Sequence, residues 1–290
     1  MSGVSTNRSD ITLPVAVSNE IMQKAKENSA VMKLARQIAL PGNGAAIQVI
    51  TSDPEASWVG ETASKPVSNP GLATKIMRGY TLAVIMPFSN QFRRDAAALY
   101  DAIIDRLPSA LGKKIDDTVF HGTAPGSDFD TFASVTAQSL ASDVYDGLVA
   151  ADTDIALNGG ITNGYVISAQ GRGILLGAKD GNDRPLFINN TAEGAIPMIL
   201  GARTELSKAA FKSGSPSVVG YAGDWTQAMY GIVEGIKIDY SSDATLEDGE
   251  GNSINLFQQN MFAVRAEIEF GFRADTSVFN ALTATGVPSV

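Results

Sequence analysis

The chain has 290 residues, of which 44% are hydrophobic and only 18% are charged, and its formal net charge is -9. This acidic charge argues against tight, sequence-independent binding of DNA or RNA and against docking on an anionic membrane surface. The absence of cysteine and the presence of a single histidine, His121, exclude disulfides, thiolate metal sites and most catalytic triads or zinc sites, so the composition predicts a protein that is not an enzyme.

The amino-terminal region is predicted to be a polar arm followed by one helix. Residues 1–17 are expected to be extended, and they lack the apolar core of a signal peptide. Ser18 or Asn19 is a candidate N-cap for a helix that runs to about Ile38, with an interrupted apolar stripe at 27–29. Since no apolar run approaches the roughly 20 residues of a membrane span, we expect synthesis in the cytosol.

The next segment has the pattern of a protruding hairpin. Ile47 and Val49 alternate with polar neighbours, and residues 60–71 are polar and rich in proline. Residues 75–88 then read as one long strand whose apolar side chains recur at every second position. Isolated hairpins are marginally stable in water, so this hairpin is expected to find its partner on another molecule.

A long helix is predicted from about residue 90 to residue 120, with Ser89 as its cap. One narrow apolar stripe runs along it, and Pro108 should kink it. The opposite face carries the charged residues Arg93, Arg94, Asp101, Asp105, Arg106, Lys113, Lys114, Asp116 and Asp117. Such a helix, with only one apolar stripe, is expected to act as a spine across which other elements lie.

The remainder reads as mixed α/β, closed by one alternating strand. Residues 137–255 contain a helix near Leu148, a strand at 165–168, a second short helix opened by residues 174–176, and several later strands. Residues 260–272 alternate between apolar and charged side chains, which predicts a half-buried strand. The chain is then expected to end in a short tail.

The order of these elements resembles the major capsid protein of tailed bacteriophages, which has the HK97 fold. The segments that carry the resemblance are ASWVGE at 56–61 with KP at 65–66, LAVIMPFSN at 82–90, YVIS at 165–168, LLGAKDGN at 175–182, PMILG at 197–201, VGYAGDW at 219–225 and NMFAVRAE at 260–267. Together they span nearly the whole chain, and their order is more specific than any one of them.

The resemblance implies an α+β, HK97-like capsid fold with five parts. These are an N-terminal arm and helix at 1–42, an extended β-hairpin (the E-loop) at 43–82, a peripheral (P) domain with the spine helix at 83–138, a mixed α/β axial (A) domain at 139–254, and a return strand of the P domain with a C-terminal tail at 255–290. It further implies a subunit without cofactor or metal that assembles with itself into pentamers and hexamers of an icosahedral shell.

The implied partners and location follow from that role. The shell would enclose double-stranded DNA without binding it tightly, and an acidic subunit fits this role. The N-terminal region is too short for the cleavable scaffolding segment of some family members, so we expect a separate scaffolding protein, a portal and an optional decoration protein. The protein would reside in the virion after assembly in the bacterial cytoplasm, with no membrane partner.

Five residues are candidate intersubunit contacts: Trp58, Glu61, Lys65, Arg93 and Arg94. Trp58 is an aromatic on an exposed arm, and aromatics are enriched among interface anchors. It is expected to pack at a subunit contact or at the base of the hairpin. Some family members form a Lys–Asn isopeptide bond aided by a Glu, and Lys65, Asn260 and Glu267 resemble that set. The alternative for Lys65 is an ordinary intersubunit ion pair.

Two other functions remain open at this point. An encapsulin-like nanocompartment shell shares the fold but encloses proteins. The glycine run at 171–177 after a strand hints at a Rossmann-type oxidoreductase, although its third glycine falls one residue late. His121 is assigned to a helix end, where a partly charged imidazole is favoured. Acidic turns at 180–183 and 247–250 are assigned to solvent because neither has the spacing of a calcium loop.

Overall fold

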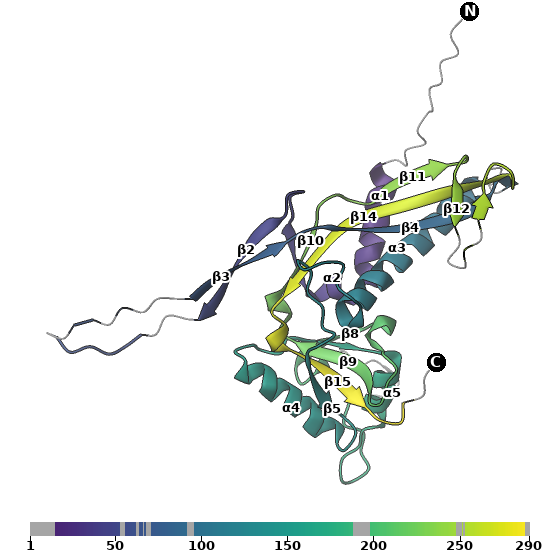
Figure 1. Cartoon of the computed structure of the whole chain (residues 1–290). Coiled ribbons are helices and arrows are strands. Elements are labelled where there is room, and N and C mark those ends of the chain that lie inside the picture. Colours follow the sequence, from purple (N-terminus) through teal and green to yellow (C-terminus); the bar gives the residue numbers. More distant parts are fainter. Residues whose placement is uncertain are drawn as a thin grey trace, which may run out of the picture.

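The computed structural model describes residues 15–52, 56–61, 64–65, 67, 71–91, 96–187, 198–247, 251 and 253–287. Two lobes and a projecting hairpin make up this part of the chain (Figure 1). The spine helix and a long mixed sheet form the first lobe, and a six-stranded sheet with two helices forms the second. No helix among the described residues is long and apolar enough to span a membrane.

The amino-terminal region contains two helices and a strand in place of the single predicted helix. Helix α1 covers Val15–Asn28, α2 covers Ala30–Leu34, and strand β1 covers Arg36–Ala39. Ser29 interrupts the helix because its side chain accepts a hydrogen bond from Met32 N and so caps α2. The prediction of a helix to Ile38 was therefore wrong. The predicted arm lies mostly outside the described residues, but Val15–Val17 are helical.

The hairpin consists of β2 (Ala45–Ser52) and β3 (Gly71–Met77), which pair antiparallel and project from the body (Figure 1). The predicted strand at 75–88 is interrupted at Arg78 and Gly79, so its first residues lie in β3 and the rest form β4 (Tyr80–Ser89). A Cβ added at Gly79 would lie 2.6 Å from Val233 Cγ2, so a larger residue there would force neighbouring side chains to shift. The interruption lies where the hairpin meets the body.

The first lobe is built around the long strand β14, which covers Met261–Ala274. On one side β14 pairs with β4 along the whole of β4, from Met261–Ser89 to Phe270–Tyr80. On the other side it pairs with β10 (Ala228–Ile232) and β11 (Lys237–Ser241). Strand β1 extends this sheet by pairing parallel to β10. Apolar side chains of β14 alternate inward, as predicted from the sequence.

Helix α3 (Ala96–His121) is the spine, and it packs against this sheet and against α1. Its buried residues Leu107 and Leu111 contact Phe262, Val264 and Ile268 on the inner face of the sheet. The apolar stripe predicted for the helix is confirmed along this described part, where Leu107, Leu111, Ile115 and Val119 are all buried. Pro108 lies inside the helix.

The second lobe has a six-stranded sheet in the order β5-β15-β9-β6-β8-β7. The strands cover Thr136–Ser139 (β5), Phe279–Ala284 (β15), Ser217–Gly223 (β9), Gly164–Ile167 (β6), Ala202–Leu206 (β8) and Met198–Ile199 (β7). Helices α4 (Val144–Leu157) and α5 (Ala169–Gly177) pack on it. Residues 174–176 therefore end a helix, whereas the sequence predicted that they open one.

Strand β15 corrects the expectation of a short C-terminal tail. All six of its residues are buried, and it pairs with both β5 and β9 inside the second sheet. The short helix η4 (Thr276–Val278) connects it to β14, so the chain passes directly from the first sheet into the second. Phe279 stacks on Phe132 with ring centroids 4.3 Å apart, and this contact lies in the large core cluster that the two lobes share.

Four smaller elements remain in the described part. Strands β12 (Thr245–Glu247) and β13 (Ser253–Asn255) form a separate two-stranded sheet before β14. The short helices η2 (Lys208–Ala210) and η3 (Trp225–Gln227) follow β8 and β9.

Candidate assembly surfaces

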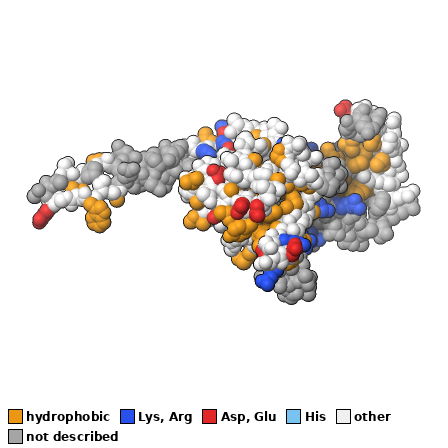
Figure 2. Space-filling model, turned by 90° about the horizontal axis from the view of Figure 1, so that it is seen from below, with side chains coloured by type: hydrophobic (Ala, Val, Ile, Leu, Met, Phe, Trp, Pro, Cys, Tyr) orange, Lys and Arg blue, Asp and Glu red, His pale blue; other side chains and the backbone are white. Residues whose placement is uncertain are grey.

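The outer end of the hairpin presents its side chains to solvent. Trp58 has a relative exposure of 106%, so it packs neither on the body nor at the base of the hairpin. The base was one of the two positions predicted for it, and that alternative is wrong. Glu61 and Lys65 are exposed on the same part of the chain. Figure 2 shows hydrophobic side chains at this outer end, far from the body.

The base of the hairpin is held by Arg273, which is only 9% exposed at the end of β14. Its Nε donates to Ile76 O of β3 at 2.8 Å. Its Nη1 donates to Asp130 Oδ1 at 2.8 Å, and its Nη2 donates to Asp128 Oδ1 at 3.1 Å. One guanidinium thus joins the hairpin, the long strand and the loop after the spine helix. A planar guanidinium with five donors suits such a site better than an ammonium.

Two further cations share the same carboxylates. Arg78 Nε lies 3.3 Å from Asp128 Oδ2, and Lys75 Nζ lies 4.0 Å from Asp130 Oδ2. Lys75 Nζ also donates to Ala274 O at 3.2 Å. We call Lys75, Arg78, Asp128, Asp130 and Arg273 the hairpin anchor. The anchor holds the base of the hairpin, while Trp58 near its outer end is exposed.

Asp116 is buried, although the sequence placed it on the charged face of the spine helix. Its exposure is 1%, and its two carboxylate oxygens accept four hydrogen bonds. The donors are Ser29 Oγ at 2.6 Å, Ala30 N at 2.9 Å, Val31 N at 3.2 Å and Ser207 Oγ at 2.9 Å. Burial raises the pKa of Asp116, and the hydrogen bonds oppose that rise.

The partners of Asp116 come from three separate parts of the chain. Ala30 N and Val31 N are free donors at the start of α2, and a carboxylate there is favoured by the helix dipole. Ser207 follows β8 in the second lobe. Asp116 therefore ties the amino-terminal helices and the second lobe to the spine, and no local sequence pattern could have indicated this.

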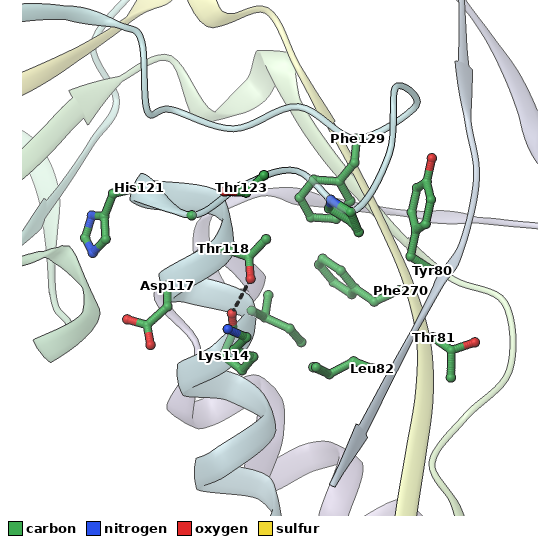
Figure 3. A pocket seen from close by; sticks show the side chains of 13 residues that line it. Tyr80, Thr81, Leu82, Lys114, Asp117, Thr118, His121, Thr123, Phe129 and Phe270 are labelled. Atoms are coloured by element: carbon green, nitrogen blue, oxygen red, sulfur yellow. Dashed lines mark hydrogen bonds between the residues drawn. The ribbon is translucent and has the colours of Figure 1, made fainter. Parts of the chain in front are cut away.

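A cavity of about 460 Å³ lies between the end of the spine helix and the start of β4 (Figure 3). Tyr80, Phe129 and Phe270 form its aromatic wall, and Figure 3 shows the side chains of His121 and Asp117 pointing away from that wall. Thr118, Lys114 and other polar residues complete the lining, so the cavity combines an aromatic wall with a polar side.

His121 is partly buried at the end of the spine helix. Its Nδ1 lies 3.4 Å from Tyr221 Oη, which donates to Phe120 O at 2.7 Å. Burial lowers the pKa of His121. Burial and the nearby Lys212 thus oppose the charged imidazole expected at a helix end, while the Asp117 carboxylate favours it.

One chain does not bring together the residues of the possible crosslink. Asn260 lies in the turn before β14, where its Oδ1 accepts from Asn90 Nδ2 at 2.8 Å. Glu267 faces Arg265, with Oε1 at 3.2 Å from Nε. Seven extended residues span about 23 Å at roughly 3.3 Å each, so Asn260 and Glu267 of the same chain are far apart. Arg93 and Arg94, two of the candidate contacts, lie outside the described residues.

The glycine run and the acidic turn have local structural explanations. A Cβ on Gly171 would lie 2.5 Å from Val219 O, so this glycine permits α5 to pack on the sheet. The Asp180 carboxylate accepts from Asn182 N and Arg184 N, both at 2.8 Å, and thereby shapes its own turn. Among the described residues, no group of three or more His, Asp and Glu side chains is placed to hold a metal ion. The turn at 247–250 lies largely outside the described part.

Comparison with known proteins gives consistent matches. The model of the family described as "Phage capsid family" matches residues 10–278. The chain is 30% identical to the probable major capsid protein gp17 of Mycobacterium phage L5, over 92% of this chain and 87% of the relative. It is 29% identical to the corresponding protein of Mycobacterium phage D29, over 92% and 88%. A solved chain from Mycobacterium phage Cain superposes with a TM-score of 0.70 at 21% identity, covering 90% of this chain and 92% of that one.

Proposed function

Because the chain belongs to the phage capsid family and is a major capsid protein with the HK97-like fold, we propose that it closes into an icosahedral shell of pentamers and hexamers around packaged double-stranded DNA. The observation that carries this proposal is the hairpin, which is anchored at its base by Arg273 and fully exposed at Trp58. In such a shell the exposed Trp58 on this hairpin would be buried against a neighbouring copy. The family does not favour the encapsulin-like shell or the oxidoreductase.

The family is one of structural proteins of the virion, and the proposed role has no catalytic step. One histidine, no cysteine and a cavity lined by aromatic side chains support that part of the proposal. The net charge of -9 supports the proposal that the shell encloses DNA without binding it tightly. Assembly in the host cytoplasm with a separate scaffolding protein, a portal and an optional decoration protein completes the proposal.

The domain roles extend the same proposal. The hairpin within 43–82 acts as the E-loop, and the first lobe, with the spine helix and β14, acts as the peripheral domain. The second lobe acts as the axial domain. We assign β15 to the axial domain because it pairs with β5 and β9 there, which shortens the return segment proposed at 255–290.

Electron microscopy of the purified particles tests the proposed function. Expected are closed shells or ring-shaped capsomers, with nuclease-protected DNA inside particles isolated from infected cells. Shells filled with protein cargo would favour the encapsulin-like alternative. A small soluble oligomer that never forms rings or shells would overturn the proposal.

Trp58 is expected to become buried on assembly. The chain contains two tryptophans, and Trp225 is already only 2% exposed, so a blue shift of the fluorescence emission on assembly would report on Trp58. Trp58→Ala should give shells that disassemble at a lower temperature, while Trp58→Phe, which keeps an aromatic anchor, should lie between this variant and the wild type. Trp58→Ala shells of wild-type heat stability would exclude the anchoring role.

Lys65 retains two candidate roles within the shell. An isopeptide bond between Lys65 and Asn260 would need at least one neighbouring copy. Because Asn260 and Glu267 are far apart along β14, the copy that supplies Asn260 could not also supply the catalytic Glu267. The other role is an ion pair between copies. Denaturing gels of mature particles separate the two, since a monomer band alone excludes the covalent bond.

A further inference from the structure

Helix α4 has apolar side chains on two faces, and one of them is uncovered. Leu148, Ala151 and Ile155 are buried against the sheet. On the outer side, Tyr145 is 47% exposed and Leu157 is 81% exposed. A surface helix of a free-standing domain has one apolar face and one polar face. We therefore expect another surface to cover the outer face of α4.

This outer face continues beyond the helix and is acidic. Val149 is 39% exposed and Ile161, just after the helix, is 77% exposed. Residues 143–161 contain four aspartates and no lysine or arginine. Figure 2 shows hydrophobic side chains gathered on the face of the body seen from below, with acidic groups among them. We call Tyr145, Val149, Leu157 and Ile161 the helix patch.

The opposite edge of the same sheet carries a second apolar patch. Met198 is 59% exposed, Leu200 is 43% exposed and Leu206 is 58% exposed. These residues lie on or beside β7 and β8, and we call them the edge patch. Strand β7 ends the described sheet, and an apolar sheet edge is a surface that proteins usually cover or charge.

The charge around the edge patch is opposite to that of the helix patch. Residues 198–212 contain Arg203, Lys208 and Lys212 and a single carboxylate, Glu205. That carboxylate is already engaged by Arg203 and by Lys33, whose Nζ lies 3.1 Å from Glu205 Oε2. Lys208 and Lys212 are exposed. The edge patch is therefore apolar with a basic surround, and it complements the acidic helix patch.

The two patches face different ways because the sheet separates them. Helix α4 packs over β5, β15 and β9, while β8 and β7 lie at the other edge of the sheet. Five strand spacings of about 4.8 Å separate the outer strands β5 and β7 by roughly 24 Å. A subunit with two different, complementary surfaces can associate head to tail with further copies. Such a chain of subunits closes into a ring when the rotation from one subunit to the next divides a full turn evenly.

We propose that the helix patch of each copy packs on the edge patch of the next copy, and that this contact closes the capsomer ring. The proposal rests on the proposed shell function and deepens it by naming the two surfaces that meet. Charge complementarity selects a second copy as the occupant of both patches, because the acidic surround of one matches the basic surround of the other.

Two charge-introducing variants of the full chain test the contact. Leu157→Lys puts a cation on the helix patch, where it would face the basic surround of the edge patch. Leu206→Glu puts an anion on the edge patch, where it would face the aspartates of α4. Both side chains are largely exposed in the single chain, so folding should be unaffected, as circular dichroism would verify. Phe257→Lys, at a site 79% exposed before β14 in the first lobe, is the matched control.

Each patch variant alone should lose rings and remain monomeric in light scattering and native mass spectrometry, while the control keeps its rings. An equimolar mixture of the two patch variants should associate at least into 1:1 dimers, because each retains the intact patch that the other needs. Folded patch variants that still form rings, or a mixture that stays monomeric, would overturn the proposed contact and leave the shell function standing. A wild-type chain that never forms rings or shells would overturn both.

Discussion

Replacing Asp116 by alanine is expected to destabilise the unassembled subunit by about 3–5 kcal/mol. The carboxylate is 1% exposed and satisfies donors from Ser29, Ala30, Val31 and Ser207. Alanine would leave these buried donors without an acceptor and would leave a small cavity beside the spine helix. The amino-terminal helices and the second lobe would both lose their connection to the spine.

Denaturant unfolding of the subunit, followed by the fluorescence of the buried Trp225 and by circular dichroism, measures this loss. Asp117→Ala is the matched control, because Asp117 is only partly buried on the next position of the same helix and surface substitutions usually change stability by under about 0.5 kcal/mol. The Asp116→Asn subunit keeps one acceptor oxygen, so its free energy of unfolding should lie between those of Asp116→Ala and Asp117→Ala. Equal stabilities of the Asp116→Ala and Asp117→Ala subunits would contradict this role for Asp116.

The sequence predicted correctly those elements in which buried side chains recur at the regular spacing of a strand or a helix. In β4 and β14 every second side chain faces the core, and in the described part of α3 the residues from Leu107 to Val119 follow one helical stripe. Local patterns could not locate β15, because six consecutive buried residues show no alternation. They also joined β3 to β4, which the structure separates at Arg78 and Gly79.

The candidate contacts at the hairpin could be predicted, but the residues that hold the hairpin could not. Trp58 stands out as an aromatic in a polar segment, and the structure exposes it fully. Arg273 lies one residue beyond the strand predicted at 260–272, so the alternation said nothing about it. It is buried because the base of β3 and the loop with Asp128 and Asp130 cover the end of β14. Asp116 was misplaced for the same reason, since its partners lie more than 80 residues away.

Arg273→Met is expected to destabilise the subunit by about 3 kcal/mol and to reduce shell formation. Methionine fills the space of the aliphatic part of the side chain but leaves Asp128 and Asp130, each about four-fifths buried, without their shared guanidinium. Ile76 O also loses its donor. Arg273→Lys should recover only part of the loss, because one ammonium cannot reproduce the fork that contacts both carboxylates and the carbonyl.

The matched control is Arg78→Met, which removes a cation from the same anchor at a side chain that is 61% exposed. A solvent-exposed ion pair contributes about 0–1 kcal/mol, so this variant should unfold and assemble almost as the wild type does. Hydrogen exchange should separate them further, with faster exchange at the amides of β3 near Met77 in Arg273→Met alone. If both variants matched the wild type in stability, exchange and shell yield, the hairpin would owe its position to β-sheet pairing, and the anchor would be incidental to assembly.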